Sequence, residues 1–203
     1  YDAELFGHWW FEGPIWLNNL FEKLYNNHHN IKVITPSEYL KLHQDNQKAL
    51  PAESSWGHKG YHQIWLNKNN DWIYRHLHEA EIIMKKITIK FGKKVDKAED
   101  ENNLVLKDYL NQMARELLLD QSSDWAFIMK RKTMDDYARK KCKKHLLNFF
   151  NLYKSISNNN SSENKKSLLK RLKKQNDLFS YLELKKYYHL KGNKKGAIEW
   201  DYL

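Results

Sequence analysis

The chain has 203 residues, of which 41% are hydrophobic and 14% aromatic, so it can build a hydrophobic core and is not disordered throughout. Its single cysteine excludes a disulfide framework and a cysteine-based metal site, and a reducing cytoplasm fits. The formal net charge is +10, while no apolar run approaches the ~18 residues of a membrane helix and no secretory signal is visible.

The first segment, YDAELFGHWWFEGP, lacks a starting Met, and we expect the true N-terminus to lie upstream of it. Residues 1–13 are interpreted as a strand end that runs into a loop. Gly13 and Pro14 then begin a helix that extends to about residue 27, because proline is tolerated in a first helical turn.

Residues 31–34 form a short apolar run that predicts a strand. Thr35-Pro36-Ser37-Glu38 is a capping box, which predicts a short helix to about residue 43. Strand, helix, strand, helix is an α/β pattern, but two strands do not make a stable sheet. We therefore expect the first 45 residues or so to be the tail of a larger α/β domain.

Residues 44–69 have a loop-like composition, yet they contain Trp56, Tyr61 and Trp65. Loops with large aromatic residues are more often functional than structural. Tryptophan stacks on sugar rings and on bases, and a nucleic-acid site would add clustered Lys and Arg, which this segment lacks. A sugar site is favoured, and the alternative is that these rings dock the helical region on a neighbour.

Helical periodicity dominates from residue 70 onward, and we predict helices at 71–90, 103–120, 133–156 and 164–174. Residues 92–101 are expected to be an exposed loop, and SNNNSSEN at 157–164 to be a linker. Residues 130–195 hold 20 basic and 5 acidic residues. Such a segment can bind nucleic acid or membrane headgroups, but a solvated Lys-rich helical face is the favoured interpretation.

Four polar or aromatic residues are candidate site residues, but the sequence pattern alone does not decide the role of each. Asp2 and Glu4 follow a predicted strand end, where an acid or base often lies, but from spacing alone two solvated carboxylates near a chain end are favoured. His8 and Trp9 lie on a Gly-containing loop and could line a cleft or belong to a core. Asp124 in SSDW could bind a sugar hydroxyl, but its neighbouring serines favour a helix cap. The histidines have no zinc-like spacing, so no metal site is expected.

Three segments, YDAELFGHWWFEGP, PAESSWGHKGYHQIWLNKNNDWIYRHLHEAE and ARELLLDQSSDWAFI, resemble the C-terminal half of glycoside hydrolase family 57 α-1,4-glucan branching enzymes. The resemblance covers nearly all of residues 1–156. It implies that residues 1–46 are the end of an incomplete (β/α)7 barrel, and that residues 47–203 are a mainly α-helical C-terminal domain.

The resemblance also implies the roles of individual residues. Asp2 matches the family's general acid/base, whereas the catalytic glutamate nucleophile belongs to an upstream part of the barrel. Trp56 and Trp65 match a pair that contacts the glucan, and Asp124 falls where the family has a substrate-contacting Asp. Trp9 matches an aromatic residue near the acid/base, and His8 lies in the same loop.

The expected activity is retaining transfer that forms α-1,6 branches on an α-1,4-glucan, which serves as donor and acceptor in storage-glucan synthesis. No cofactor or metal is expected, nor a nucleic-acid or membrane partner, and the expected location is cytoplasmic. An α-amylase or 4-α-glucanotransferase of the same family is an alternative, as is a non-catalytic glucan-binding module.

Overall fold

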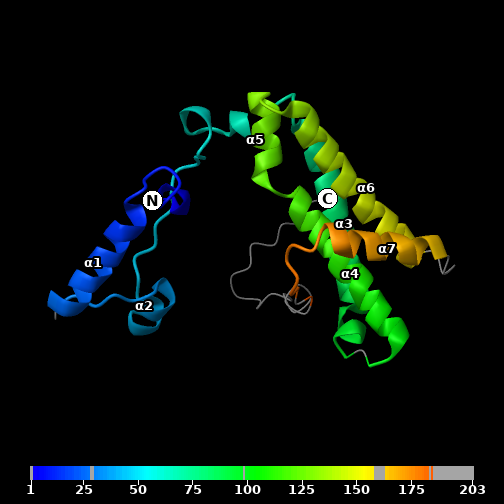
Figure 1. Ribbon diagram of the computed structural model, residues 1–203, viewed down its shortest axis with the longest axis horizontal. Helices are drawn as coiled ribbons and strands as arrows, with labels where there is room; N and C mark the ends of the chain where they lie inside the picture. The colour runs from blue at the N-terminus through cyan, green and yellow to red at the C-terminus, as the bar shows by residue number, and fades with distance from the viewer. Residues whose placement is uncertain (1, 28–29, 98, 158–162, 183, 185–203) are drawn as a thin grey trace. The chain divides into compact units, whose positions relative to one another are not determined.

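The computed structural model describes residues 2–27, 30–97, 99–157, 163–182 and 184, and the chain divides into two compact units, residues 1–52 and 53–203 (Figure 1). The regular elements of the described ranges are helices, with short 3₁₀ turns between them. The α-helices are α1 (Gly13–Asn27), α2 (Pro36–Leu42), α3 (Asp71–Asp96), α4 (Glu101–Asp120), α5 (Ser123–Arg131), α6 (Asp135–Ser157) and α7 (Glu163–Gln175). The 3₁₀ turns are η1 (Ala3–Leu5), η2 (His58–Gly60) and η3 (His62–Ile64).

The first unit confirms both helices that the sequence predicts there. The capping box at α2 is complete, because the Thr35 hydroxyl accepts the Glu38 N–H at 3.2 Å and the Glu38 carboxylate accepts the Thr35 N–H at 2.8 Å. At the start of α1 a Cβ on Gly13 would lie 2.9 Å from Phe6 Cα. Glycine therefore lets the N-terminal turn approach the helix.

The two strands expected in this unit are wrong. Residues 31–35 are coil without a pairing partner, and residues 2–12 form η1 and turns with one isolated bridge between Phe6 and Trp10. A strand needs a neighbour that satisfies its backbone N–H and C=O groups, and apolar sequence alone does not supply one. The described residues contain no strand, so the fold on view is helical, and a barrel tail is not among its features.

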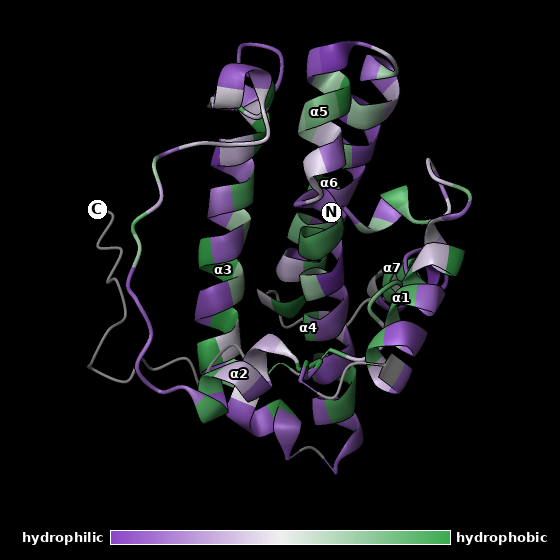
Figure 2. Ribbon diagram, turned by 90° about the vertical axis from the view of Figure 1, so that its left-hand side faces the viewer, coloured by the Kyte–Doolittle hydropathy of each residue, from purple (hydrophilic) through white to green (hydrophobic). Residues whose placement is uncertain are grey.

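The second unit is a helical domain built on α4 and α6, whose pairing is the most extensive in the chain (Figure 1). Helix α3 packs on α4, α5 packs on α6, and α7 contacts both α4 and α6. Hydrophobic and hydrophilic residues alternate along α3 in Figure 2, as expected for a helix with one buried face. The loop expected at 92–101 is partly wrong, because α3 continues to Asp96 and buries Gly92 and Val95.

Large side chains from several helices fill the core of this domain. Met113 from α4 and Leu152 from α6 are fully buried, and Phe149 is nearly so. Helix α5 contributes Met129 and α7 contributes Leu172, both also fully buried. Burial of one such side chain contributes about 1.5–3 kcal/mol, so this core is the main source of stability of the second unit.

A buried polar network ties α4 to α6 and to the segment after α7. One Glu116 carboxylate oxygen lies 2.7 Å from His145 Nδ1 and accepts from Asn148 at 3.1 Å, and the other accepts from Gln112 at 2.9 Å and from Asn176 at 2.7 Å. Burial alone would raise the pKa of Glu116, but the hydrogen bonds outweigh it and hold the pKa below its ordinary value. Glu116 is therefore a buried carboxylate whose two oxygens both have hydrogen-bond partners.

Asp120, one turn further along α4, has the opposite environment. It is buried, and no nitrogen or oxygen donor of the described residues reaches either of its carboxylate oxygens. Burial raises the pKa of Asp120 to about 6, although the Cys142 thiol and the charge of His145 oppose the rise. The same burial, with the nearby Asp120 charge, raises the pKa of Cys142.

Two further expectations concern the linker after α6 and the absence of a membrane helix. The linker expected at 157–164 lies mostly in residues 158–162, which are outside the described residues. Within the described part of the chain, no helix has the length and hydrophobicity that a membrane span requires.

Candidate functional site

The site begins with the loop that precedes α3, and Ser55 organises this loop. The Ser55 hydroxyl donates to the Tyr61 carbonyl at 2.7 Å and accepts the Gly57 N–H at 2.9 Å, and the Ser55 N–H donates to the Gly60 carbonyl at 2.7 Å. A Cβ on Gly57 would overlap the Tyr61 carbonyl oxygen. The loop therefore closes tightly on itself only because residue 57 has no side chain.

Trp65 is held in place from two directions. Its indole N–H donates to the Ser55 hydroxyl at 3.3 Å, and its carbonyl accepts a hydrogen bond from the Tyr74 hydroxyl in α3. The side chain is half-buried. One hydrogen bond therefore holds the Trp65 ring and the other holds its backbone.

Asn70, fully buried, joins this loop to helix α5. Its side-chain NH₂ donates to the Ile64 carbonyl at 2.9 Å and to the Ala126 carbonyl at 3.0 Å, while its oxygen accepts the Asn67 N–H at 2.9 Å. A buried amide with both donors and its acceptor satisfied fixes the position of the groups around it. The loop and α5 therefore form one rigid surface.

Three aromatic rings meet on this surface and form what we term the aromatic triad, Trp56, Trp65 and Phe127. The ring centroids lie 6.2 Å apart for Trp56 and Trp65, 5.9 Å for Trp56 and Phe127, and 6.3 Å for Trp65 and Phe127. Trp56 is 69% exposed, which is unusual for so large a side chain in a well-packed region. The triad presents apolar ring surface to solvent beside a cavity.

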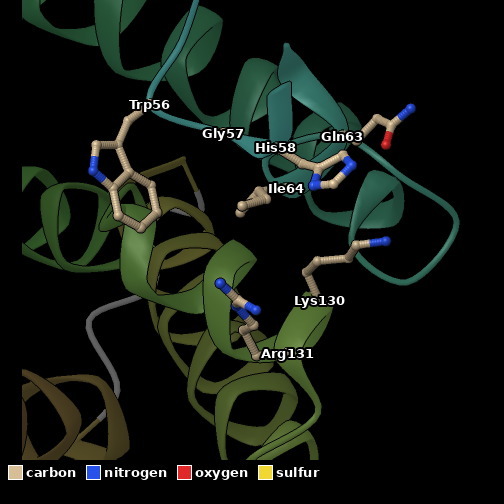
Figure 3. Close-up of a pocket in the computed structure, with 7 residues that line it drawn as sticks. All are labelled: Trp56, Gly57, His58, Gln63, Ile64, Lys130 and Arg131. Carbon is tan, nitrogen blue, oxygen red and sulfur yellow. The ribbon is translucent and has the colours of Figure 1, made fainter. Parts of the chain in front are cut away.

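The cavity has a volume of about 530 Å³ (Figure 3). Its lining is Trp56, Gly57, His58, Gln63, Ile64, Lys130 and Arg131. Trp56 and its neighbours come from the loop on one side, and the two cations come from the end of α5 on the other. The Arg131 guanidinium carbon lies 5.3 Å from the Phe127 ring centroid, so it borders the triad as well as the cavity.

Asp124 lies outside the cavity lining but on the same helix as Phe127. Its exposed carboxylate accepts the Ser122 hydroxyl at 2.8 Å in the first turn of α5. Ser122 occupies the N-cap position, as the pattern predicted, although its side chain bonds to Asp124 rather than to a backbone N–H. Residues 124 and 127 are three apart and therefore share one helix face.

In the first unit, the candidate residues lie on the N-terminal turns. Asp2 is exposed at the N-cap of η1 and its side chain caps no backbone group. The His8 ring packs edge-on against Trp9 with a centroid distance of 5.0 Å, and Trp9 is 72% exposed. Trp10, by contrast, packs on neighbouring rings of its own unit. Of the two adjacent tryptophans, Trp9 is therefore the more exposed and Trp10 the more packed.

Similarity to known proteins identifies the family. A family model described as "1,4-alpha-glucan branching enzyme, C-terminal" matches residues 76–187, which is more than half of the chain. The chain belongs to this family of branching-enzyme C-terminal domains. Together with the relatives and solved structures that follow, this match confirms the resemblance to the C-terminal part of glycoside hydrolase family 57 branching enzymes.

Sequence relatives agree with this assignment. The 1,4-α-glucan branching enzyme of Thermococcus kodakarensis is 33% identical over 75% of this chain. A probable 1,4-α-glucan branching enzyme of Mycobacterium tuberculosis is 32% identical over 71% of it. The aligned part spans 21% of the length of the first enzyme and 27% of the second. The chain thus corresponds to a minor share of each relative.

Solved structures extend the likeness to most of the chain. The GH57-type branching enzyme of Pyrococcus horikoshii has a TM-score of 0.66 at 31% identity, covering 93% of this chain and 34% of that one. The GH57 branching enzyme of Thermococcus kodakaraensis, solved in complex with glucose and additives, has a TM-score of 0.65 at 30% identity. The match covers 92% of this chain and 32% of that one. The α-amylase AmyC of Thermotoga maritima has a TM-score of 0.58 at 38% identity. The match covers 93% of this chain and 32% of that one.

Reasoning from the sequence anticipated two members of the triad and missed the third. The aromatic residue of SSDW is not part of the triad, because the Trp125 indole N–H donates to the Leu119 carbonyl at 2.8 Å and the Trp125 ring packs against the core. Phe127, two residues later, takes the place beside Trp56 and Trp65. No helix was predicted over this residue, and its position three residues after Asp124 was the one signal that could have pointed to it.

The residues that the structure describes contain no group of three or more His, Cys, Asp and Glu side chains that is arranged to hold a metal ion. His62 pairs with Glu53 at 3.2 Å and His145 pairs with Glu116, so two of the histidines serve as hydrogen-bonding partners.

Proposed function

We propose that this chain is the C-terminal part of a glycoside hydrolase family 57 enzyme that transfers segments of an α-1,4-glucan and creates α-1,6 branches. The family assignment and the branching enzymes among its relatives support this activity. In this proposal residues 1–46 complete the end of the catalytic (β/α)7 barrel, which packs against an upstream part of the same protein, and residues 47–203 are the helical domain.

The proposed reaction is a retaining transfer in two steps. A carboxylate nucleophile from the upstream barrel attacks the anomeric carbon of an α-1,4 bond, and Asp2 donates a proton to the departing 4-oxygen. The resulting glycosyl-enzyme is attacked by the 6-hydroxyl of an acceptor glucan, whose proton returns to Asp2. Such a mechanism needs the two carboxyl groups roughly 5–5.5 Å apart, with Asp2 protonated before the first step.

The aromatic triad is the observation that carries the glucan-binding part of the proposal. A glucosyl ring has apolar C–H faces, and exposed rings that are held rigidly bind such faces with little loss of conformational entropy. Trp65 is immobilised by Ser55 and Tyr74, and Trp56 projects beside it. We assign Trp56 and Trp65 to the glucan, with Asp124 accepting a sugar hydroxyl further along α5 and with Trp9 and His8 near the acid/base.

The decisive experiment is an iodine-stain and debranching assay on amylose with the full-length protein. New α-1,6 linkages would support the proposal. Reducing sugar without new branches would favour the second candidate, an α-amylase, which the likeness to AmyC at 38% identity makes a specific alternative. No change in amylose would leave a glucan-binding module.

The remaining features of the proposal follow from the same assignment. The substrate would be a storage glucan such as glycogen, acting as donor and acceptor, in the cytoplasm. The proposed chemistry uses carboxyl groups alone, so it assigns no role to a cofactor or a metal, and it involves neither nucleic acid nor a membrane.

A further inference from the structure

The cavity beside the triad is lined by cations and lacks carboxylates. Lys130 and Arg131 border it, together with His58 and Gln63, and no Asp or Glu is part of the lining. Neither cation forms an ion pair or a side-chain hydrogen bond with another described residue, and the Arg131 guanidinium lies over the Phe127 ring. The donors of both side chains are therefore available to a ligand.

A purely structural role accounts for only part of this charge. Both cations lie in the last turn of α5, where basic residues counter the partial negative charge of about −0.5 at a helix C-terminus. Two full positive charges exceed that partial charge. In addition, the helix end is closed by the Lys132 N–H, which donates to the Ile128 carbonyl at 2.8 Å from a left-handed residue. A net positive cavity remains.

We propose that this cavity binds a phosphate monoester carried on a glucosyl unit, with the sugar ring against Trp56 and the phosphate on Lys130 and Arg131. Binding of the sugar ring rests on the proposed function, whereas binding of the phosphate is argued from the charges of Lys130 and Arg131 alone. An Arg guanidinium presents paired donors that match a phosphate group, and Lys adds a compact charge. At about 530 Å³ the cavity falls in the size range of small-molecule sites and exceeds the needs of a bare anion.

The arrangement in Figure 3 explains why one ligand could use both halves. Trp56 and Ile64 form the apolar wall from the loop, and Arg131 reaches the space between them and the end of α5. Because Arg131 also borders Phe127, its guanidinium is held at the boundary between the ring surface and the polar end. A phosphorylated residue within a glucan chain and a free hexose phosphate share this chemistry.

The test compares a matched pair of ligands on the full-length protein. Maltotriose and maltotriose 6-phosphate are titrated at low ionic strength, with glucose 6-phosphate and inorganic phosphate as further probes. We expect the phosphorylated trisaccharide to bind at least tenfold more tightly than maltotriose, and this advantage to shrink in high salt. Tighter binding of maltotriose 6-phosphate than of glucose 6-phosphate would indicate a chain-borne phosphate as the source, and the reverse would indicate a free hexose phosphate.

Variants locate the effect. In Lys130→Gln/Arg131→Gln the affinity ratio of phosphorylated to plain maltotriose should fall at least tenfold. Lys140→Gln/Lys144→Gln removes the same charge from the exposed face of α6 and should leave the ratio within twofold. All four side chains are exposed, so both double variants should fold, which circular dichroism can verify.

Three outcomes would overturn the inference. These are equal binding of the two trisaccharides, equal loss in the two double variants, and inorganic phosphate binding as tightly as the sugar phosphates. If maltotriose fails to bind while glucose 6-phosphate binds through Lys130 and Arg131, the glucan site of the proposed function fails and the anion site remains. The two proposals can therefore fail separately.

Discussion

The Trp65 indole N–H donates to the Ser55 hydroxyl at 3.3 Å, across ten residues of loop. The same hydroxyl donates to the Tyr61 carbonyl and accepts the Gly57 N–H, so one small side chain links the ring to the loop that carries Trp56. Ser55 thus positions the aromatic triad without being part of it.

Replacing this hydroxyl should loosen the triad. In Ser55→Ala the Trp65 N–H and the Gly57 N–H both lose their acceptor, which should cost about 1 kcal/mol of stability. We expect maltooligosaccharide affinity to fall about three- to tenfold, because the unbonded ring samples other orientations. Titration followed by tryptophan fluorescence measures this, with the exposed Ser54→Ala as control. An unchanged affinity would show that packing alone orients Trp65.

Gly57 and Gly60 provide a matched comparison within the same loop. Gly57→Ala places a Cβ against the Tyr61 carbonyl oxygen, and we expect a loss of about 1–3 kcal/mol in the free energy of unfolding together with loss of glucan affinity. Gly60 has φ +79° and open space around it, so Gly60→Asn carries backbone strain but no steric overlap, and it should cost less than Gly57→Ala because Asn is among the residues that tolerate this backbone region best. Thermal unfolding of both variants tests the prediction, which fails if Gly57→Ala is as stable as Gly60→Asn.

The assignment of Asp2 as the general acid/base can be tested by substituting this residue in the full-length enzyme. Asp2→Asn keeps the shape of the side chain but cannot donate or accept the proton, and we expect branching activity to fall about 10²–10⁴-fold. Glu4→Gln, two residues away, should keep most of its activity. Branching activity measured side by side in the two variants separates the roles of Asp2 and Glu4. Retained branching in Asp2→Asn would refute the assignment.

Local signals gave the helices of this fold, whereas the sheet prediction failed. The capping box at Thr35 and the apolar periodicity of α4 and α6 are properties of consecutive residues, and both were confirmed. Residues 31–34 are apolar enough for a strand, but strand formation depends on a partner elsewhere in space. Gly92 was interpreted as a loop residue, yet burial of Val95 beyond it keeps α3 helical.

The candidate site was likewise predictable from the sequence only in part. Trp56 and Trp65 stood out because exposed aromatic residues in a loop are uncommon, and the structure brings them together. Phe127 could not be found, because its proximity depends on Asn70, which joins the loop to α5 across 56 residues of sequence. The roles of Asp2, His8, Trp9 and Asp124 remain predictions.

The buried carboxylate of Glu116 should be essential for the helical domain. Glu116→Gln replaces two acceptor oxygens by one and turns an acceptor into a donor beside Asn148 or Asn176, so we expect a loss of about 3 kcal/mol. The exposed Glu79→Gln is the control. Because the pKa of Glu116 is lower in the folded chain than its ordinary value of 4.5, its contribution is present above pH 4.5 and disappears as the pH falls through the folded pKa. Urea unfolding at neutral and acidic pH measures both effects, and a fully stable variant would contradict the network.

Asp120 should have the opposite pH dependence. Its pKa rises from 3.8 to about 6 on folding, so between these values the folded chain binds more protons than the unfolded chain, and the free energy of unfolding falls as the pH rises. The full effect of a pKa of about 6 in place of 3.8 is about 3 kcal/mol. Asp120→Asn cannot ionise, so its stability relative to the wild-type chain should increase from pH 4 to pH 7 by about that amount, while exposed Asp45→Asn should show no such trend. Urea unfolding across this range provides the measurement, and a constant difference between Asp120→Asn and the wild-type chain would mean that Asp120 ionises in the folded protein without a penalty.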